Sequence, residues 1–344
     1  MSYAPKFTIT SGILKSISAI ENAKAIIETS PLLPLYERQF KNDANVRMAH
    51  FGTAVEGNKL DLGNVRKIID GKGDKVIGRE RDIQEVLNYR QVVSFIDKYQ
   101  ERSISANTIK KINAITTEKT VAEEYRGKYR HSQNYFVNLV TGERIFTPPP
   151  ADEVVAHMEE FIDYINSKES GENHPAIRAG IIHDRIVSIH PFADGNGRTA
   201  RACATLSLYL DKYDIKKFFS LEEYYDLDVL SYYKAISEGH DDLTCWISYF
   251  CQGLAVELSH IKERVLKMSR DVEIKEKVGQ IYLSERQEKI IDFLNANGRL
   301  KNRDFAKIFP DISEDTVLRD IKDLIKNKIA VKKGSTKSSF YELR

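Results

Sequence analysis

The spacing of apolar residues predicts a chain that is mainly helical. Apolar residues recur at helical spacing over residues 83–93 and again over 154–165. Strand-like patterning is rare before residue 329, and the exception is the segment 135–145. Two β-prone runs there flank Thr141-Gly142, which is typical of a hairpin turn. We therefore expect a helical body that carries one β-hairpin.

A second pattern begins near residue 283. Apolar runs at helical spacing predict short helices around residues 290–294, 305–309 and 317–325. Two β-prone runs, at 329–331 and 339–343, then predict a small hairpin. Three helices followed by a hairpin are typical of a winged helix-turn-helix, a small α+β domain.

These patterns divide the 344 residues into four parts. We expect an N-terminal helical region over residues 1–80 and a larger helical core over 81–265. A charge-rich stretch at 262–277 is typical of a solvated helix or a linker, and we expect the linker over 266–282. Residues 283–344 form the predicted winged-helix module.

Composition excludes several classes of protein. The 52 lysines and arginines nearly balance the 50 acidic residues, so the chain is neither a polybasic arm nor an acidic disordered tail. No run of about 18 apolar residues occurs, and the first twenty residues lack the pattern of a secretory signal. The three cysteines form no Cys-x-x-Cys pair. We expect a cytoplasmic protein that does not span a membrane.

The segment 190–201 carries the densest set of chemically useful side chains. It reads His-Pro-Phe-Ala-Asp-Gly-Asn-Gly-Arg-Thr-Ala-Arg. A helix over 175–189 should end at His190, because Pro191 disfavours helical geometry in the residue before it. A tight turn at Gly195-Asn196-Gly197 would then lead into a second helix over 199–210.

The start of that second helix favours an anion, because its first amides are unpaired and its dipole is positive there. Arg198 and Arg201 lie at the same place, where a cation costs about 0.3–1 kcal/mol. A polyphosphate would offset both charges. Asp194 is one carboxylate, which suffices for Mg²⁺ when phosphates complete the coordination. His190 can accept a proton from a nucleophile.

Each of these residues also has an ordinary structural explanation. A histidine at a helix end is usually a surface group, the glycines are typical of a turn, and arginines often form surface ion pairs. The ordered combination within twelve residues favours a site.

This segment resembles the signature of the Fic domain family, His-x-Phe-x-(Asp/Glu)-Gly-Asn-Gly-Arg-x-x-Arg, at every position. The resemblance extends over residues 35–260. It implies a mostly helical Fic fold with a β-hairpin flap, and transfer of AMP from ATP to a Ser, Thr or Tyr hydroxyl of a protein. It also leaves open a homodimer and modification of the chain by itself.

The resemblance implies a role for each residue of the signature. His190 would activate the target hydroxyl as a base, and Asp194 would hold Mg²⁺ on the α- and β-phosphates. Gly195, Asn196 and Gly197 would form the phosphate-binding turn, and Phe192 would pack in the core. Arg198 and Arg201 would bind the β- and γ-phosphates.

Two further segments resemble parts of the same family. The hairpin at 135–145 resembles the flap that positions a target peptide by strand pairing. Tyr232-Tyr233 resembles the tyrosine pair that lines the adenine pocket. Tyr224-Tyr225 is an alternative pair, and paired aromatics on helices are more often core residues.

The segment 53–58, Thr-Ala-Val-Glu-Gly-Asn, resembles the family's inhibitory motif, (Ser/Thr)-x-x-x-Glu-(Gly/Asn). The match is imperfect, because the position four residues before Glu56 is Gly52 rather than a hydroxyl residue. In the family this glutamate pairs with the second arginine, here Arg201, and ATP then binds with its α-phosphate misaligned. A carboxylate would compete with the γ-phosphate for that guanidinium. Alternatively, Glu56 belongs to a surface helix that ends at Gly57.

The C-terminal module has 14 basic and 10 acidic residues over 284–344. Its basic excess lies on the predicted third helix and hairpin, where it could contact DNA phosphates. Protein binding is equally open, because acidic residues share that helix. The basic residues are Arg319, Lys322, Lys326, Lys328, Lys332, Lys333 and Lys337.

The leading functional hypothesis is an autoinhibited protein adenylyltransferase that uses ATP and Mg²⁺. A nucleotide-sensing, DNA-binding regulator is one alternative, although sensing alone would not require His190. A Mg²⁺-dependent phosphohydrolase that removes AMP from proteins is another, in which Glu56 would position water.

Overall fold

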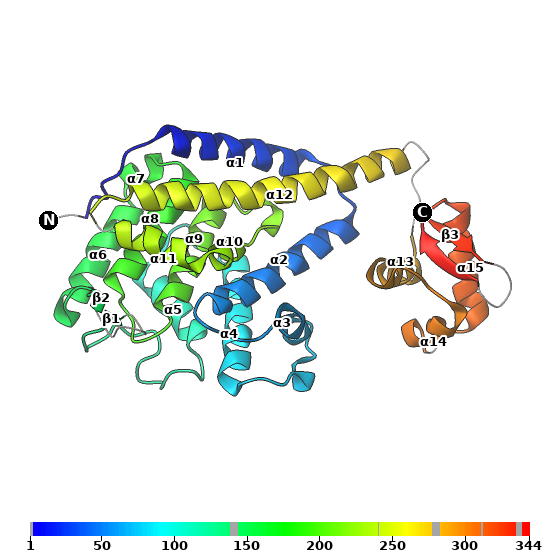
Figure 1. The fold of residues 1–344 in the computed structure, drawn as a ribbon, viewed down its shortest axis with the longest axis horizontal. Coiled ribbons are helices and arrows are strands. Elements are labelled where there is room, and N and C mark those ends of the chain that lie inside the picture. Colours follow the sequence, from blue (N-terminus) through cyan, green and yellow to red (C-terminus); the bar gives the residue numbers. More distant parts are fainter. Residues whose placement is uncertain (1–2, 138–143, 240, 277–282, 311, 335–338) are drawn as a thin grey trace. The chain divides into compact units, whose positions relative to one another are not determined.

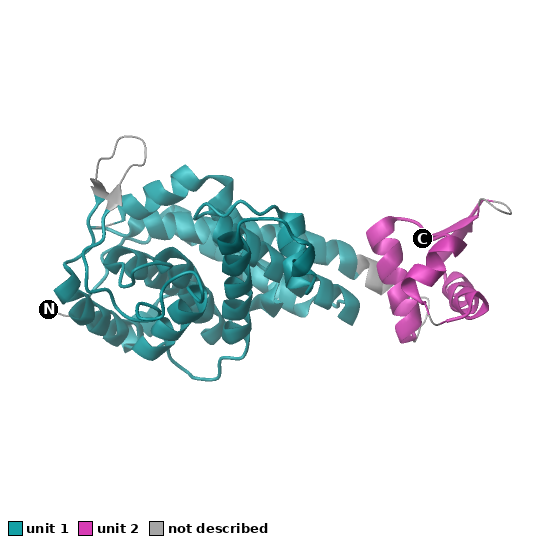
Figure 2. Cartoon of the chain, turned by 90° about the horizontal axis from the view of Figure 1, so that it is seen from below, with its two compact units in different colours: residues 1–269 teal, residues 270–344 magenta. Residues whose placement is uncertain are grey.

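The computed structural model describes residues 3–137, 144–239, 241–276, 283–310, 312–334 and 339–344. The chain divides into two compact units, residues 1–269 and 270–344, which Figure 2 shows in different colours. The first unit is mainly helical, as the sequence predicts. Among the described residues, no helix combines the length and the apolar character needed to cross a membrane.

The N-terminal part of the first unit is built from helices that begin at clear signals. The Thr10 side chain caps the first helix by accepting from the Ile13 amide, and Pro34 opens the second. Ser105 forms a capping box with Thr108 at the start of α5. The elements are α1 (Ser11–Thr29), α2 (Pro34–Ala54), α3 (Leu62–Ile69), η1 (Gly73–Lys75), α4 (Glu80–Asp97) and α5 (Ala106–Thr116).

The rest of the first unit surrounds the helix pair α8 and α9. Buried aromatic side chains, among them Phe192, Trp246 and Phe250, fill its core. The elements are β1 (Phe136–Val137), β2 (Arg144–Phe146), η2 (Ala151–Glu153), α6 (Val154–Ile165), α7 (Lys168–Glu172), α8 (Pro175–Ile189), α9 (Asn196–Leu210), η3 (Ile215–Lys217), α10 (Glu222–Leu227), α11 (Val229–Glu238) and α12 (Thr244–Glu276).

The long helix α12 lies alongside α1 in Figure 1, and Lys262 donates to the Asn22 side chain between them. It remains helical through residues 266–276, the first part of the stretch in which the sequence allowed a linker. Cys203 and Cys251 are buried in the first unit, whereas Cys245 is exposed.

The predicted hairpin is present in the first unit. Strand β1 pairs antiparallel with β2, with Phe136 opposite Phe146 and an irregularity before Val137 pairs with Arg144. The predicted turn at Thr141-Gly142 lies outside the described residues.

The start of α9 differs from the sequence prediction. The helix begins at Asn196, three residues earlier than expected, with Gly195 as its N-cap. Asn196 and Gly197 are therefore the first residues of the helix rather than part of a turn before it. The helix begins early because Gly195, at φ +74°, reverses the chain in a single residue.

The second unit contains the three predicted helices and the hairpin in the predicted order. Ser284 caps the first helix and Gly298, at φ +73°, ends it. Leu300 adds a bridge to Tyr341 on the edge of the hairpin, and both side chains are buried. The elements are α13 (Glu285–Asn297), η4 (Asn302–Asp304), α14 (Phe305–Ile308), α15 (Glu314–Lys326), β3 (Ala330–Lys333) and β4 (Phe340–Leu343).

Candidate active site

The loop between α8 and α9 holds His190 in a left-handed conformation, with φ 50° and ψ 56°. Helix α8 ends at Ile189, as Pro191 predicts, and the His190 amide donates to the Ile186 carbonyl at 3.0 Å. At the other end of the loop, a Cβ atom on Gly195 would lie 2.8 Å from the Thr117 side chain. Glycine is therefore required there for space as well as for its positive φ.

Hydrogen bonds within the loop fix its shape. The Asn196 side chain accepts from the Phe192 amide at 2.9 Å and donates to the Phe192 carbonyl at 2.8 Å. Phe192 is fully buried, as expected. Asn113 on α5 donates to the Asp194 carbonyl at 2.9 Å. The Asn196 side chain thus spans the loop internally, and only its backbone is placed to contribute to an anion site.

Arg198 and Arg201 both bind the carboxylate of Glu56. Glu56, just past the end of α2, accepts from Arg198 Nε and from Arg201 Nη2, each at 2.7 Å. Arg201 also donates to the Gly52 carbonyl at 2.8 Å. Burial alone would raise the pKa of Glu56, but Arg198 and Arg201 outweigh burial and hold that pKa below its usual value. Glu56 is therefore an anion at neutral pH, in contact with two buried cations.

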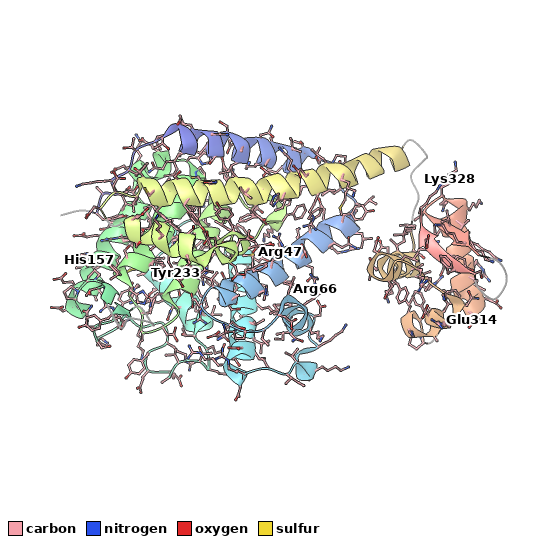
Figure 3. All side chains as sticks on the ribbon, viewed as in Figure 1. Arg47, Arg66, His157, Tyr233, Glu314 and Lys328 are labelled. Atoms are coloured by element: carbon pink, nitrogen blue, oxygen red, sulfur yellow. The ribbon has the colours of Figure 1, made fainter. Side chains whose placement is uncertain are left out.

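Partly buried ion pairs of Arg47 hold helix α2 in place and thereby position the glutamate that follows it. Arg47 on α2, labelled in Figure 3, pairs with Glu257 on α12 at 2.8 Å and with Glu223 on α10 at 2.6 Å. Glu56 thus follows a helix that is anchored to two other elements of the unit.

Asp194 is engaged with two cations. Its carboxylate accepts from Arg81 Nη2 at 2.9 Å and from Arg198 Nη2 at 3.3 Å. Arg81, at the start of α4, also binds Glu85 at 3.0 Å, and Glu85 lies 3.5 Å from Arg198. A divalent ion at Asp194 would therefore have to displace the Arg81 guanidinium.

His190 is neutral at physiological pH. Its pKa is lowered to about 4, chiefly by burial. A hydrogen bond with the Val187 backbone opposes this shift, Arg130 adds to it, and the charges of Glu56 and Asp194 oppose it. A neutral imidazole can act as a base, because one of its ring nitrogens can take up a proton.

Comparison with known proteins identifies the segment around this loop. Residues 103–208 match the Fic/DOC family. This segment therefore resembles a Fic domain.

Individual proteins that are similar to this chain point to the same family. The chain is 28% identical over 199 residues to protein adenylyltransferase fic-1 of Caenorhabditis briggsae, covering 56% of this chain and 37% of that protein. It is 30% identical over 158 residues to the protein adenylyltransferase fic-1 of Caenorhabditis elegans, covering 44% and 29% of the two chains. The matches span about a third of the length of these curated relatives.

Solved structures share the fold. A Fic family protein from Desulfovibrio desulfuricans superposes with a TM-score of 0.68 at 22% identity, covering 99% of this chain and 98% of that one. A Fic-1 fragment from C. elegans gives 0.61 at 20% identity, covering 76% and 73%. The mainly helical Fic fold expected from the sequence is therefore confirmed.

Gly52, the position at which the resemblance calls for a hydroxyl residue, is a glycine for a steric reason. A Cβ atom on Gly52 would lie 2.9 Å from the ring of Tyr89, whose hydroxyl donates to buried Glu222. A serine or threonine at Gly52 would not fit against that ring. Thr53 instead turns its hydroxyl onto the Ala49 and His50 carbonyls, within α2.

The two tyrosines that resemble an adenine-pocket pair lie in different environments. Tyr232 is 1% exposed, and its hydroxyl lies 3.1 Å from His183 Nε2 and 3.4 Å from Arg201 Nη1. Tyr233, labelled in Figure 3, is 46% exposed and donates to the Val55 carbonyl at 3.4 Å. Of the pair, only Tyr233 is exposed enough to contact a nucleotide base. Tyr232 is buried beside Arg201. In the alternative pair, Tyr225 is buried against the Tyr232 ring.

Four residues around the candidate site escaped the sequence analysis. Arg81 and Glu85 look like an ordinary i, i+4 helix pair, and nothing in the sequence connects them to Asp194. Asn113 and Arg130 bind backbone carbonyls of the 190–194 loop, and such contacts leave no motif.

Proposed function

We propose that this protein is an autoinhibited protein adenylyltransferase that transfers AMP from ATP to a hydroxyl side chain of a protein. The observation that carries the proposal is the position of neutral His190 beside an α9 start that presents two buried arginines, both occupied by Glu56. The names of the relatives, protein adenylyltransferases, support the same reaction.

In the proposed reaction the target hydroxyl oxygen bonds to the α-phosphorus of ATP. The bond between the α-phosphorus and the bridging oxygen to the β-phosphate breaks, and pyrophosphate leaves. Neutral His190 takes the hydroxyl proton. The backbone amides at the start of α9 and the two guanidiniums stabilise the phosphate charge.

Asp194 is the residue that would hold Mg²⁺. Its oxygen ligand type suits this ion, and the carboxylate is partly exposed at the edge of the α9 start. Among the described residues no three metal-binding side chains gather together, so the phosphates of ATP must complete the coordination. The bound ion would neutralise phosphate charge.

Glu56 is the proposed inhibitory residue. Its two oxygens take one donor from each arginine, and these are donors that the terminal phosphates of ATP need. ATP must either displace the carboxylate or bind with its terminal phosphate elsewhere. Removing the carboxylate should therefore activate transfer.

The hairpin β1–β2 is the proposed docking site for the target protein. An edge strand can pair with an extended peptide through main-chain hydrogen bonds, without dependence on its side chains. The target could be another protein or a second copy of this chain.

We also propose that the second unit binds DNA through α15 and the following hairpin, as a winged helix does. Arg319, Lys322 and Lys326 are exposed on α15. Asp320, which would weaken this surface, is instead buried and ion-paired with Arg286 at 2.7 Å.

Product analysis tests the reaction. With ATP and Mg²⁺, transfer yields AMP-modified protein plus pyrophosphate in equal amounts. Release of AMP from a pre-modified protein would instead favour the hydrolase. If neither product forms, a nucleotide sensor is favoured.

A further inference from the structure

Arg130 is a buried cation whose guanidinium is used entirely on backbone carbonyls. It is 3% exposed and lies between α5 and β1. Its guanidinium donates to the carbonyls of His190 at 2.9 Å, Ser132 at 3.0 Å and Pro149 at 2.5 Å. A fourth, longer contact reaches the Ile189 carbonyl at 3.5 Å.

The end of α8 explains why such a donor is needed. A helix leaves its last carbonyls without partners, and Pro191 stops α8 abruptly at Ile189. Arg130 supplies those carbonyls with donors from its side chain, and its own amide donates to the Pro191 carbonyl at 2.8 Å. Arg130 thereby binds the carbonyl of His190 and the carbonyls of both neighbouring residues, which fixes the left-handed backbone of His190.

The same guanidinium contacts the chain on both sides of the β1–β2 hairpin, just before β1 and just after β2. Ser132 comes shortly before β1, and Pro149 comes shortly after β2. Two further hydrogen bonds support this arrangement. The Asn134 side chain donates to the Phe192 carbonyl at 3.1 Å, and the Gln133 side chain donates to the Pro148 carbonyl at 3.0 Å. Arg130 thus contacts the His190 backbone and the chain on both sides of the hairpin at once.

We propose that Arg130 is a positioning residue that fixes the β1–β2 hairpin relative to His190, so that a hydroxyl on a docked polypeptide meets the imidazole. This inference rests on the proposed transfer reaction. None of the hydrogen bonds described for Arg130 reaches Glu56, Arg198 or Arg201. Loss of Arg130 should therefore disturb the delivery of the target and spare the binding of ATP.

The test uses the full chain carrying Glu56→Gly, to which Arg130→Met or Arg130→Lys is added. Arg178→Met is the matched control, because Arg178 also joins a backbone carbonyl, that of Ile165 at 2.8 Å, to another element through Asp211. The measured quantities are protein-bound AMP, free AMP formed when water replaces the target, and the Kd of ATP.

We expect Arg130→Met to lower the ratio of protein-bound to free AMP by about tenfold or more, because a misplaced reactant loses its orientation advantage. The Kd of ATP should change by less than about twofold. Arg130→Lys should restore part of the ratio, and Arg178→Met should leave it unchanged. A folded Arg130→Met variant with an unchanged ratio would overturn the proposal.

A second measurement separates this proposal from the proposed reaction. If the chain with Arg130 intact and Glu56→Gly forms no AMP product, the reaction is wrong and hydrogen exchange then decides the role of Arg130. Arg130→Met should speed amide exchange at residues 131–137 and at Phe146 and Thr147 more than Arg178→Met does. Equal exchange in the two variants would overturn the positioning role.

Discussion

The Glu56 carboxylate accepts a hydrogen bond from Arg201 at 2.7 Å, although 145 positions separate the two residues in the sequence. Its second oxygen binds Arg198 at the same distance. A charge-assisted contact of this kind is among the stronger hydrogen bonds in proteins. Under the proposed inhibition, phosphate oxygens of ATP would compete for the same donors, so the stability of this contact should set how strongly the carboxylate opposes ATP.

The charge of Arg81 should oppose metal binding at Asp194. Arg81→Ala removes the guanidinium that contacts Asp194 at 2.9 Å, so a divalent ion no longer has to displace it. We expect tighter Mn²⁺ binding in the presence of ATP, measured by electron paramagnetic resonance. Arg79→Ala is the control, because Arg79 pairs with Asp82 rather than with Asp194. Identical Mn²⁺ titrations for the wild type and Arg81→Ala would count against a metal at Asp194.

Restoring a side chain at Gly52 should destabilise the protein. A Cβ atom there lies 2.9 Å from the Tyr89 ring, so Gly52→Ala should cost about 1–3 kcal/mol of unfolding free energy through overpacking. In a Tyr89→Ala background the additional cost should shrink, which a double-mutant cycle in urea measures. Gly171→Ala, with no atom within 4 Å of the added Cβ, is the control. Equal costs in both backgrounds would show that Tyr89 is not the obstacle.

Stability should depend on pH through His190. Its pKa in the folded protein is about 4, whereas a histidine in an unfolded chain titrates near ~6.5. The unfolded state takes up the proton first, so the stability is full above about pH 6.5 and falls as the pH drops toward about 4. Urea midpoints at pH 7 and pH 5 should differ more for the wild type than for His190→Asn. Parallel losses would argue that His190 is not buried in its neutral form.

The two lysines at the end of β3 should contribute unequally to DNA binding. Lys333 pairs with Glu342 at 2.7 Å, whereas no ion pair is described for Lys332. Lys332→Ala should reduce the slope of log K against log salt by about 1, and Lys333→Ala by less. The measurement is duplex binding by fluorescence anisotropy at several salt concentrations. No binding at low salt would remove the DNA proposal.

Short-range signals predicted much of this fold. Pro191 determines where α8 ends, and the two β-prone runs within 135–145 predict the β1–β2 pairing. In each case the decisive interaction lies within a few residues of the signal. The same locality explains why the order of elements after residue 283 was predictable.

Contacts between distant residues were not predictable in the same way. The family resemblance paired Glu56 with Arg201 alone. In the structure Glu56 also accepts from Arg198, and Arg201 also donates to the Gly52 carbonyl. Arg130 binds backbone carbonyls, which every residue possesses, so no side-chain pattern marks its partners. The burial of Tyr232 behind Arg201 depends on how α11 packs, and the doubled tyrosine gave no sign of which ring would face outward.

The mass of the intact protein after incubation with ATP and Mg²⁺ tests the central claim most directly. The wild type, Glu56→Gly, and Glu56→Gly combined with His190→Ala are compared, with self-modification as the readout. The account predicts a gain of one or more AMP units that is larger in Glu56→Gly than in the wild type and absent when His190 is also replaced. No gain in Glu56→Gly despite measured ATP binding, or an undiminished gain without His190, would contradict it.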